Sequence, residues 1–103
     1  MSASDDELLA ALREARQRLE NAGRTAMESK AEHLHVTFTA ARRELAVADG
    51  DVRHRQERIA TGEYTPEEAE HLGALRRRQI EANGTVDALR RHIRAFLDGP
   101  ESQ

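Results

Sequence analysis

Two short stretches of the sequence have residue types and a spacing that suit a metal site: both read Glu-x-x-His, at Glu32 to His35 and at Glu68 to His71. On a helix this spacing places a carboxylate and an imidazole on one face, as in di-iron carboxylate bundles. The hairpin predicted below separates His35 from His71 by about 25 residues of helix, or roughly 40 Å. We therefore predict no metal site and interpret the histidines as solvated helix residues. A site that Glu68 and His71 share with a second copy is the alternative.

Other patterns typical of catalysis or cofactor binding are missing from the sequence. It contains no cysteine, no glycine-rich phosphate loop and no Gly-x-Ser-x-Gly motif. Charged residues make up 34% of the chain and aromatic residues 3%, which is typical of long helices and leaves little material for a walled pocket. We therefore predict that the protein is not an enzyme and has neither a catalytic residue nor a cofactor.

Charge is distributed unevenly over the second half of the chain. Acidic residues dominate between residues 57 and 70, and arginines dominate between residues 76 and 94. The acidic stretch is a candidate partner-binding site, formed by Glu63, Glu67 and Glu68. The basic stretch offers a possible basic face, formed by Arg77, Arg91 and Arg94. The alternative is structural, because acids favour a helix N-terminus through the macrodipole and arginines solvate an outer face.

The same pattern disfavours a nucleic-acid partner. The formal net charge is -3, no aromatic residue lies between the arginines, and Asp87 interrupts them. We expect a protein partner instead, including a second copy of this chain. Without a secretion signal or a membrane-length apolar run, we expect a cytoplasmic protein, or a virion-associated one if a phage encodes it. Lys30 is the only lysine, and so strong a preference for arginine is typical of GC-rich genomes such as those of actinobacteria and their phages.

The acidic stretch resembles part of one known family. Gly62-Glu63-Tyr64-Thr65-Pro66-Glu67-Glu68-Ala69-Glu70-His71, followed by Ala74-Leu75-Arg76, is similar to the Gly-Asp-Leu-x-Glu-Asn-Ala-Glu-Tyr stretch at the coiled-coil tip of Gre-type transcript-cleavage factors. The resemblance covers under a fifth of the chain, needs a one-residue insertion at Pro66 and places His71 where the family has tyrosine. It implies a regulator that contacts RNA polymerase, with Glu63 and Glu67 as tip acids that help to hold a catalytic metal.

A seven-residue repeat predicts the fold. Apolar residues recur at alternating spacings of three and four, which marks one buried seam on a long helix. The seam residues of the second half are Leu72, Leu75, Gln79, Ala82, Val86, Leu89, Ile93 and Phe96. A matching seam lies upstream, in Leu34, Phe38, Ala41, Leu45, Ala48, Val52, Arg55 and Ile59. The seams pair position by position when the chain folds back at residues 62–65, so we predict an all-α protein with a long antiparallel helical hairpin, or coiled coil.

Start and stop signals set the helix ends. Three capping boxes, each with a hydroxyl and an acid three residues later, mark helix starts. They are formed by Ser4 and Glu7, by Thr25 and Glu28, and by Thr65 and Glu68. We predict one helical domain over residues 1–103, with helices at about 5–22, 26–60 and 66–98. The last two helices run through Gly50 and Gly84, because burial of the seam outweighs a cost of about 1 kcal/mol per glycine.

The shorter N-terminal helix has no partner within the hairpin register. It either folds back to complete a three-helix bundle or pairs with another chain in an oligomer. A thin second apolar face is available for folding back, formed by Val36, Ala40, Val47, Ile80, Ala88 and Ala95. We predict that the apolar face of the N-terminal helix is the partner-binding or self-association face. Its candidate residues are Leu8, Leu12 and Leu19.

The predicted function is a non-catalytic protein–protein interaction module, that is, an assembly, adaptor or regulatory subunit that acts through helical packing. Self-association is expected, because a two-helix seam with this much alanine is marginally stable by itself. Two alternatives stay open: a transcription regulator that contacts RNA polymerase through the acidic tip, and a weak nucleic-acid binder that uses the arginine-rich stem.

Overall fold

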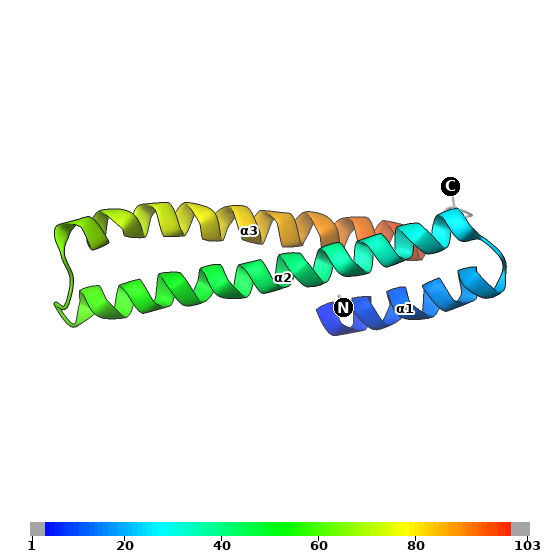
Figure 1. Cartoon of the computed structure of the whole chain (residues 1–103), viewed down its shortest axis with the longest axis horizontal. Coiled ribbons are helices and arrows are strands. Elements are labelled where there is room, and N and C mark those ends of the chain that lie inside the picture. Colours follow the sequence, from blue (N-terminus) through cyan, green and yellow to red (C-terminus); the bar gives the residue numbers. More distant parts are fainter. Residues whose placement is uncertain (1–3, 100–103) are drawn as a thin grey trace. The chain divides into compact units, whose positions relative to one another are not determined.

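The computed structural model describes residues 4–99, and three helices account for most of them (Figure 1). They are α1 (Asp5–Asn21), α2 (Thr25–Ala60) and α3 (Pro66–Asp98). The predicted fold class is confirmed: the protein is all-α, α2 and α3 pack as an antiparallel hairpin, and α1 is the shorter N-terminal helix. Every helix begins and ends within one residue of its predicted position.

Packing divides the helices into two units. The three-helix unit consists of α1, of α2 up to Ala40, and of α3 from Asp87 onward. The two-helix unit consists of residues 41–86, which are the remainder of α2, the connecting turn and the first part of α3. That the chain acts as a single domain stays a prediction.

Two of the three predicted capping boxes begin their helices. The Glu7 amide donates to the Ser4 hydroxyl at 3.2 Å, and the Glu68 amide donates to the Thr65 hydroxyl at 3.2 Å. The third box, at Thr25, is wrong. Thr25 is the first residue of α2, and the Glu28 amide donates to the Arg24 carbonyl at 2.9 Å. The backbone already satisfies that amide, so the threonine hydroxyl is not needed as a cap.

Glycines at positive φ end α1 and α2. Gly23 has a φ of 71° and Gly62 a φ of 76°, which side chains with a Cβ rarely adopt. After α1, Gly23 donates to the Glu20 carbonyl at 3.0 Å and Arg24 to the Leu19 carbonyl at 2.8 Å. The same pair of bonds follows α2, at Gly62 and the residue after it. Both ends are therefore Schellman motifs, which turn the chain while satisfying the last carbonyls.

The predicted seams form the core of both units. Phe38 and Ile93 are fully buried in the three-helix unit, and Val52 and Val86 are buried in the two-helix unit. Every other seam position is buried or half-buried. Burying a large apolar side chain stabilises by about 1.5 to 3 kcal/mol, which exceeds the cost of one glycine in a helix. As predicted, α2 and α3 run through Gly50 and Gly84 without a break.

The N-terminal helix folds back onto its own chain, so the first of the two alternatives describes the structure. Leu12 of α1 and Ala31 of α2 line one groove, while Leu19 of α1 and Phe96 of α3 line another. The second apolar face predicted to receive this helix is not buried by it, although Val36 lines the groove between α1 and α2. Val36 is 60% exposed and Ile80 70% exposed. The reason is that α1 packs beside the seam itself, where Ala31 is almost fully buried.

Replacing Phe38 by alanine is expected to reduce the free energy of unfolding by about 3 to 5 kcal/mol, because Phe38 is 0% exposed and the change leaves a cavity. The matched control is Val36→Ala on the same helix, which is expected to change stability by less than about 0.5 kcal/mol. Chemical denaturation followed by circular dichroism measures both. Equal losses in the two variants would contradict this placement of the core.

Candidate interaction surfaces

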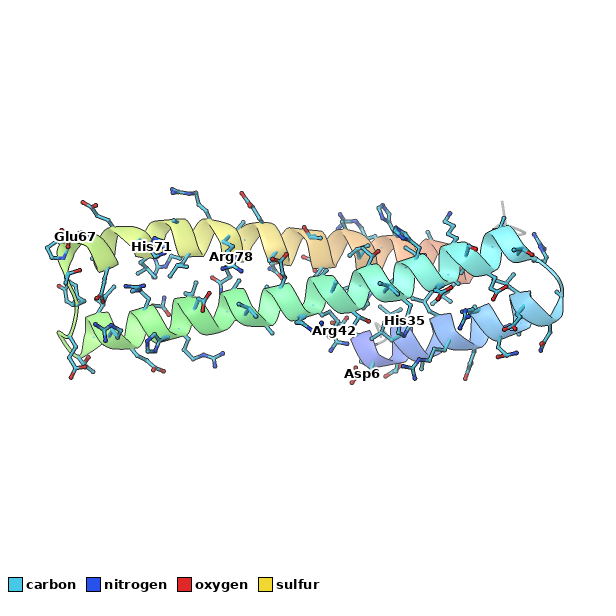
Figure 2. All side chains as sticks on the ribbon, viewed as in Figure 1. Asp6, His35, Arg42, Glu67, His71 and Arg78 are labelled. Carbon is cyan, nitrogen blue, oxygen red and sulfur yellow. The ribbon has the colours of Figure 1, made fainter. Side chains whose placement is uncertain are left out.

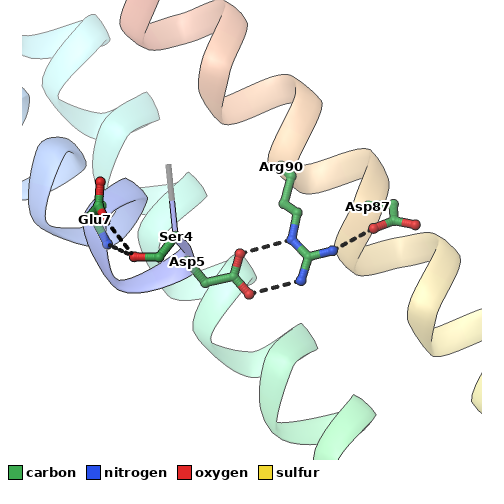
Figure 3. A network of polar contacts seen from close by, with 5 residues as sticks. All are labelled: Ser4, Asp5, Glu7, Asp87 and Arg90. Atoms are coloured by element: carbon green, nitrogen blue, oxygen red, sulfur yellow. Dashed lines mark hydrogen bonds and ion pairs between the residues drawn. The ribbon is translucent and has the colours of Figure 1, made fainter. Parts of the chain in front are cut away.

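An ion-pair clamp fixes the start of α1 to α3 (Figure 3). The Arg90 guanidinium donates to both carboxylate oxygens of Asp5, at 2.8 and 2.9 Å, and also to Asp87 one turn before it on α3. The side chain of Arg90 is 29% exposed and that of Asp5 21% exposed. The hydrogen bonds to Asp5 raise the pKa of Arg90 above its usual value. Sequence reasoning assigned Arg90 to a solvated stem, because the pairing depends on where α1 docks.

The acidic tip is only partly available to a partner. Glu68 accepts hydrogen bonds from Arg58 at 3.0 and 3.2 Å and lies 3.3 Å from Arg55. The hydrogen bonds from Arg58 lower the pKa of the Glu68 carboxyl. Glu63 and Glu67 are exposed, and Figure 2 shows Glu67 at the start of α3. Glu68 therefore helps to hold α2 against α3, while Glu63 and Glu67 remain candidates for a partner.

Polar bonds further along the two-helix unit agree with the predicted register. The Gln79 side-chain amide donates to Asp49 at 2.8 Å, and Arg78 donates to Asp51 at 3.4 Å. The register places Gln79 opposite Val52, within one helical turn of both acids. Gln79 is the polar member of its seam, and its bond to Asp49 satisfies an amide that burial would otherwise leave unpaired.

The possible basic face is divided between the two units. Arg77 is exposed on the two-helix unit, whereas Arg91 is exposed and Arg94 half-buried on the three-helix unit. Neither unit by itself presents all three arginines. The proposal of a single basic surface therefore gains no support from the packing within a unit.

The predicted partner-binding face of α1 needs correction. Leu8 is 3% and Leu12 1% exposed, so both leucines belong to the core of their own chain. Leu19 is half-buried and lines a groove of about 280 Å³ together with Phe96, Met27 and two arginines. Of the three predicted leucines, Leu19 is the one that a partner can reach.

A smaller groove of about 140 Å³ between α1 and α2 contains His35. Figure 2 shows the His35 ring on the side of α2 that faces α1. Its Nε2 atom is buried and makes no hydrogen bond with the residues described. Burial lowers the pKa of His35, and the nearby charges of Arg13 and Arg16 lower it further. Glu32, its partner in the Glu-x-x-His motif, lies 4.0 Å from Arg16 instead of pairing with the imidazole.

The two-helix unit carries an open groove of about 290 Å³. Its lining comes from both helices and comprises Leu45, Asp49, Gln79, Ile80 and Asn83. Ile80 is 70% exposed, which is more than the exposed valines Val36 and Val47. Sequence reasoning noticed the apolar character of Ile80 but assigned it to the docking face of α1. Because α1 packs elsewhere, Ile80 stays uncovered.

Comparisons with protein-family models, with curated proteins and with solved structures found no match to this chain. Within residues 4–99, no helix is long and apolar enough to cross a lipid bilayer. These same residues contain no group of three His, Asp or Glu side chains placed to hold a metal ion. The functional proposal therefore rests on the geometry and chemistry of the chain itself.

Acid is expected to destabilise the protein through His35. The unfolded imidazole titrates near the ordinary pKa of 6.5, whereas burial lowers the folded pKa below that value. As the pH falls below 6.5, the unfolded state binds more protons, and stability decreases until the pH has passed the folded pKa. His35→Leu should remove this part of the acid sensitivity, and His92→Gln, at an exposed position, should retain it. Denaturation at neutral and mildly acidic pH measures the difference; an equal acid loss in all three proteins would contradict the assignment.

Breaking the Asp5–Arg90 clamp is expected to loosen α1. Arg90→Met keeps much of the aliphatic length but removes charge-assisted bonds at a half-buried site, and should reduce stability by about 1 to 2 kcal/mol. Arg91→Met changes an exposed neighbour and should have an effect below about 0.5 kcal/mol. Hydrogen exchange of α1 amides reports the loosening directly. If α1 protection is unchanged in Arg90→Met, the clamp does not hold this helix.

Proposed function

We propose that this protein is a non-catalytic protein–protein interaction module, which serves as an assembly, adaptor or regulatory subunit and acts through helical packing. The observation that carries the proposal is the uncovered layer of the two-helix unit. There the seam residues Leu45, Leu72 and Leu75 are only half-buried, and Ile80 is 70% exposed. A helix is stabilised by burying its apolar stripe against another element. The missing third element is therefore expected from another polypeptide, including a second copy of this chain.

The polar side chains of the grooves support a binding role. Asp49 accepts a hydrogen bond from Gln79, and Glu32 lies 4.0 Å from Arg16. A general base must lie within hydrogen-bond reach of a substrate proton, and an activated nucleophile needs an adjacent base. Asp49 is instead occupied by the neutral Gln79 amide, and the exposed Glu32 lies beside a guanidinium; neither group is a base that could activate a nucleophile. Their arrangement fits structural pairing better than acid–base catalysis.

Site-specific photo-crosslinking in cells tests this function. A photoreactive residue at position 80 is expected to give a covalent adduct, because Ile80 lies on the uncovered layer. The matched control is position 36, where Val36 is also exposed but lies on the three-helix unit. Light scattering of the purified chain then shows whether the adduct reflects a second copy, since the monomer has a mass of 11.6 kDa. The absence of any adduct specific to position 80 would contradict the proposal.

A second candidate function is a polymerase-directed regulator that acts through the turn between α2 and α3. The observation in its favour is that Glu63 and Glu67 are both exposed there. Glu68 is a poor candidate for this role because Arg58 and Arg55 engage it. Replacing Glu63 and Glu67 together by alanine should abolish an activity that depends on the tip, while leaving crosslinking from position 80 intact. Loss of crosslinking in that double variant would argue against two separate surfaces.

A further inference from the structure

Within the three-helix unit, α1 shows which kind of helix fits beside α2 and α3. The first three turns of its apolar face are inserted, with Leu8, Leu12 and Ala15 all buried. Its first turn is acidic, and one of those acids, Asp5, is clamped by Arg90 of α3. The helix accepted by this packing is therefore amphipathic and begins with carboxylates.

On α2, the residues that line the open groove occupy the same heptad positions as residues that line the groove beside α1, two heptads later in the sequence. Ala31 and His35 line the groove between α1 and α2 in the three-helix unit. Leu45 and Asp49 stand two heptads after them on the same helix, and both line the open groove of the two-helix unit. Residues two heptads apart share a face of a helix in a hairpin of this kind. The α2 positions that face a third helix in one unit are thus the positions left open in the other.

The same repeat relates the α3 side of the two units. Arg76 stands two heptads before Arg90, the residue that clamps α1. Likewise Asn83, in the open groove, stands two heptads before Leu97, which lines the groove beside Leu19. Arg76 is exposed and forms no ion pair with a carboxylate of residues 4–99. The two-helix unit therefore presents an arginine in the clamping position without the acid that the clamp holds.

We propose that the open groove of the two-helix unit binds an amphipathic helix with an acidic first turn, contributed by another protein. This inference rests on the proposed function and specifies the chemistry of the partner. The partner helix runs parallel to α3, covers Leu45 and Ile80 with its apolar face, and places a first-turn carboxylate on Arg76. A helix with a basic first turn would instead place its positive charges beside that of Arg76.

A peptide copied from residues 4–17 of this chain is a suitable probe, because it keeps the acidic start and the buried leucines of α1 and ends before the level of Arg90, where α1 itself begins. Fluorescence anisotropy of the labelled peptide, titrated with the full-length protein, measures the dissociation constant. Arg76→Glu and Ile80→Asp are each expected to weaken binding by about tenfold. Arg77→Glu alters an exposed neighbour and should leave the dissociation constant within about twofold of the wild type.

A charge exchange makes the test specific for the clamp. A peptide whose three first-turn acids are replaced by lysine should bind the wild type weakly and should regain affinity for Arg76→Glu. Circular dichroism confirms that the variants keep their helices, which is expected because Arg76 and Ile80 are exposed. Restored binding in this crossed pair cannot arise from a general loss of folding.

Four outcomes would overturn the inference. The first is that the peptide does not bind at all, and the second is that lysine exchange does not restore binding to Arg76→Glu. The third is that binding is lost in Arg90→Glu but kept in Arg76→Glu, since the peptide would then be displacing α1 from the three-helix unit. The fourth is that an adduct from position 80 has twice the mass of the chain and persists in excess peptide, since the occupant is then a second copy. Crosslinking from position 80 separates this inference from the proposed function, because an adduct without peptide binding leaves the function standing with a different partner.

Discussion

Burial of one heptad seam of α2 against the matching seam of α3 is the interaction on which the rest of the structure depends. Phe38, Val86 and Ile93 are its fully buried large side chains. Isolated helices are marginal in water even when their residues favour helix, so each long helix is held by this contact. The helix ends only limit how far the seam extends. Two local features set these ends: the glycines of the two Schellman motifs end α1 and α2, and acidic residues favour the first turns.

The apolar residues of the chain form a buried seam between α2 and α3 along the whole hairpin. They form a core between three helices only in the three-helix unit. Hydrophobic residues make up 38% of the chain, and many of them are alanine, which buries little area. The leucines of α1 add the third layer to one unit, where Ala31, Leu34 and Phe38 are buried. In the other unit, the seam residues Leu45, Leu72 and Leu75 remain half-buried. An added helix would therefore bury more apolar area in the two-helix unit than in the three-helix unit.

Local and periodic features of the sequence were sufficient to predict the hairpin and its helix ends. Capping signals act over three or four residues, and the seam repeats every seven, so both are visible without a structure. The position of α1 was not visible, because Ala31 looks no different in sequence from other alanines. The Asp5–Arg90 clamp was missed for the same reason, since its partners lie far apart in the chain and meet only after α1 has docked. Ile80 was recognised as apolar but assigned to the wrong neighbour.

Two polar residues, Arg55 and Gln79, occupy seam positions in the two-helix unit. They help to fix the register between α2 and α3, and they also leave less apolar area buried there. Across the hairpin, Arg55 lies 3.3 Å from Glu68 and Gln79 donates to Asp49, while the buried Arg55 Nε makes no hydrogen bond with the residues described. Such pairs fix which residues face each other, because a shifted register would leave half-buried polar groups unpaired. They contribute less stability than apolar side chains at the same positions would. The polar pairs at Arg55 and Gln79 therefore select one register at the positions where the seam buries least apolar area. An additional apolar helix would increase the buried apolar area of this unit.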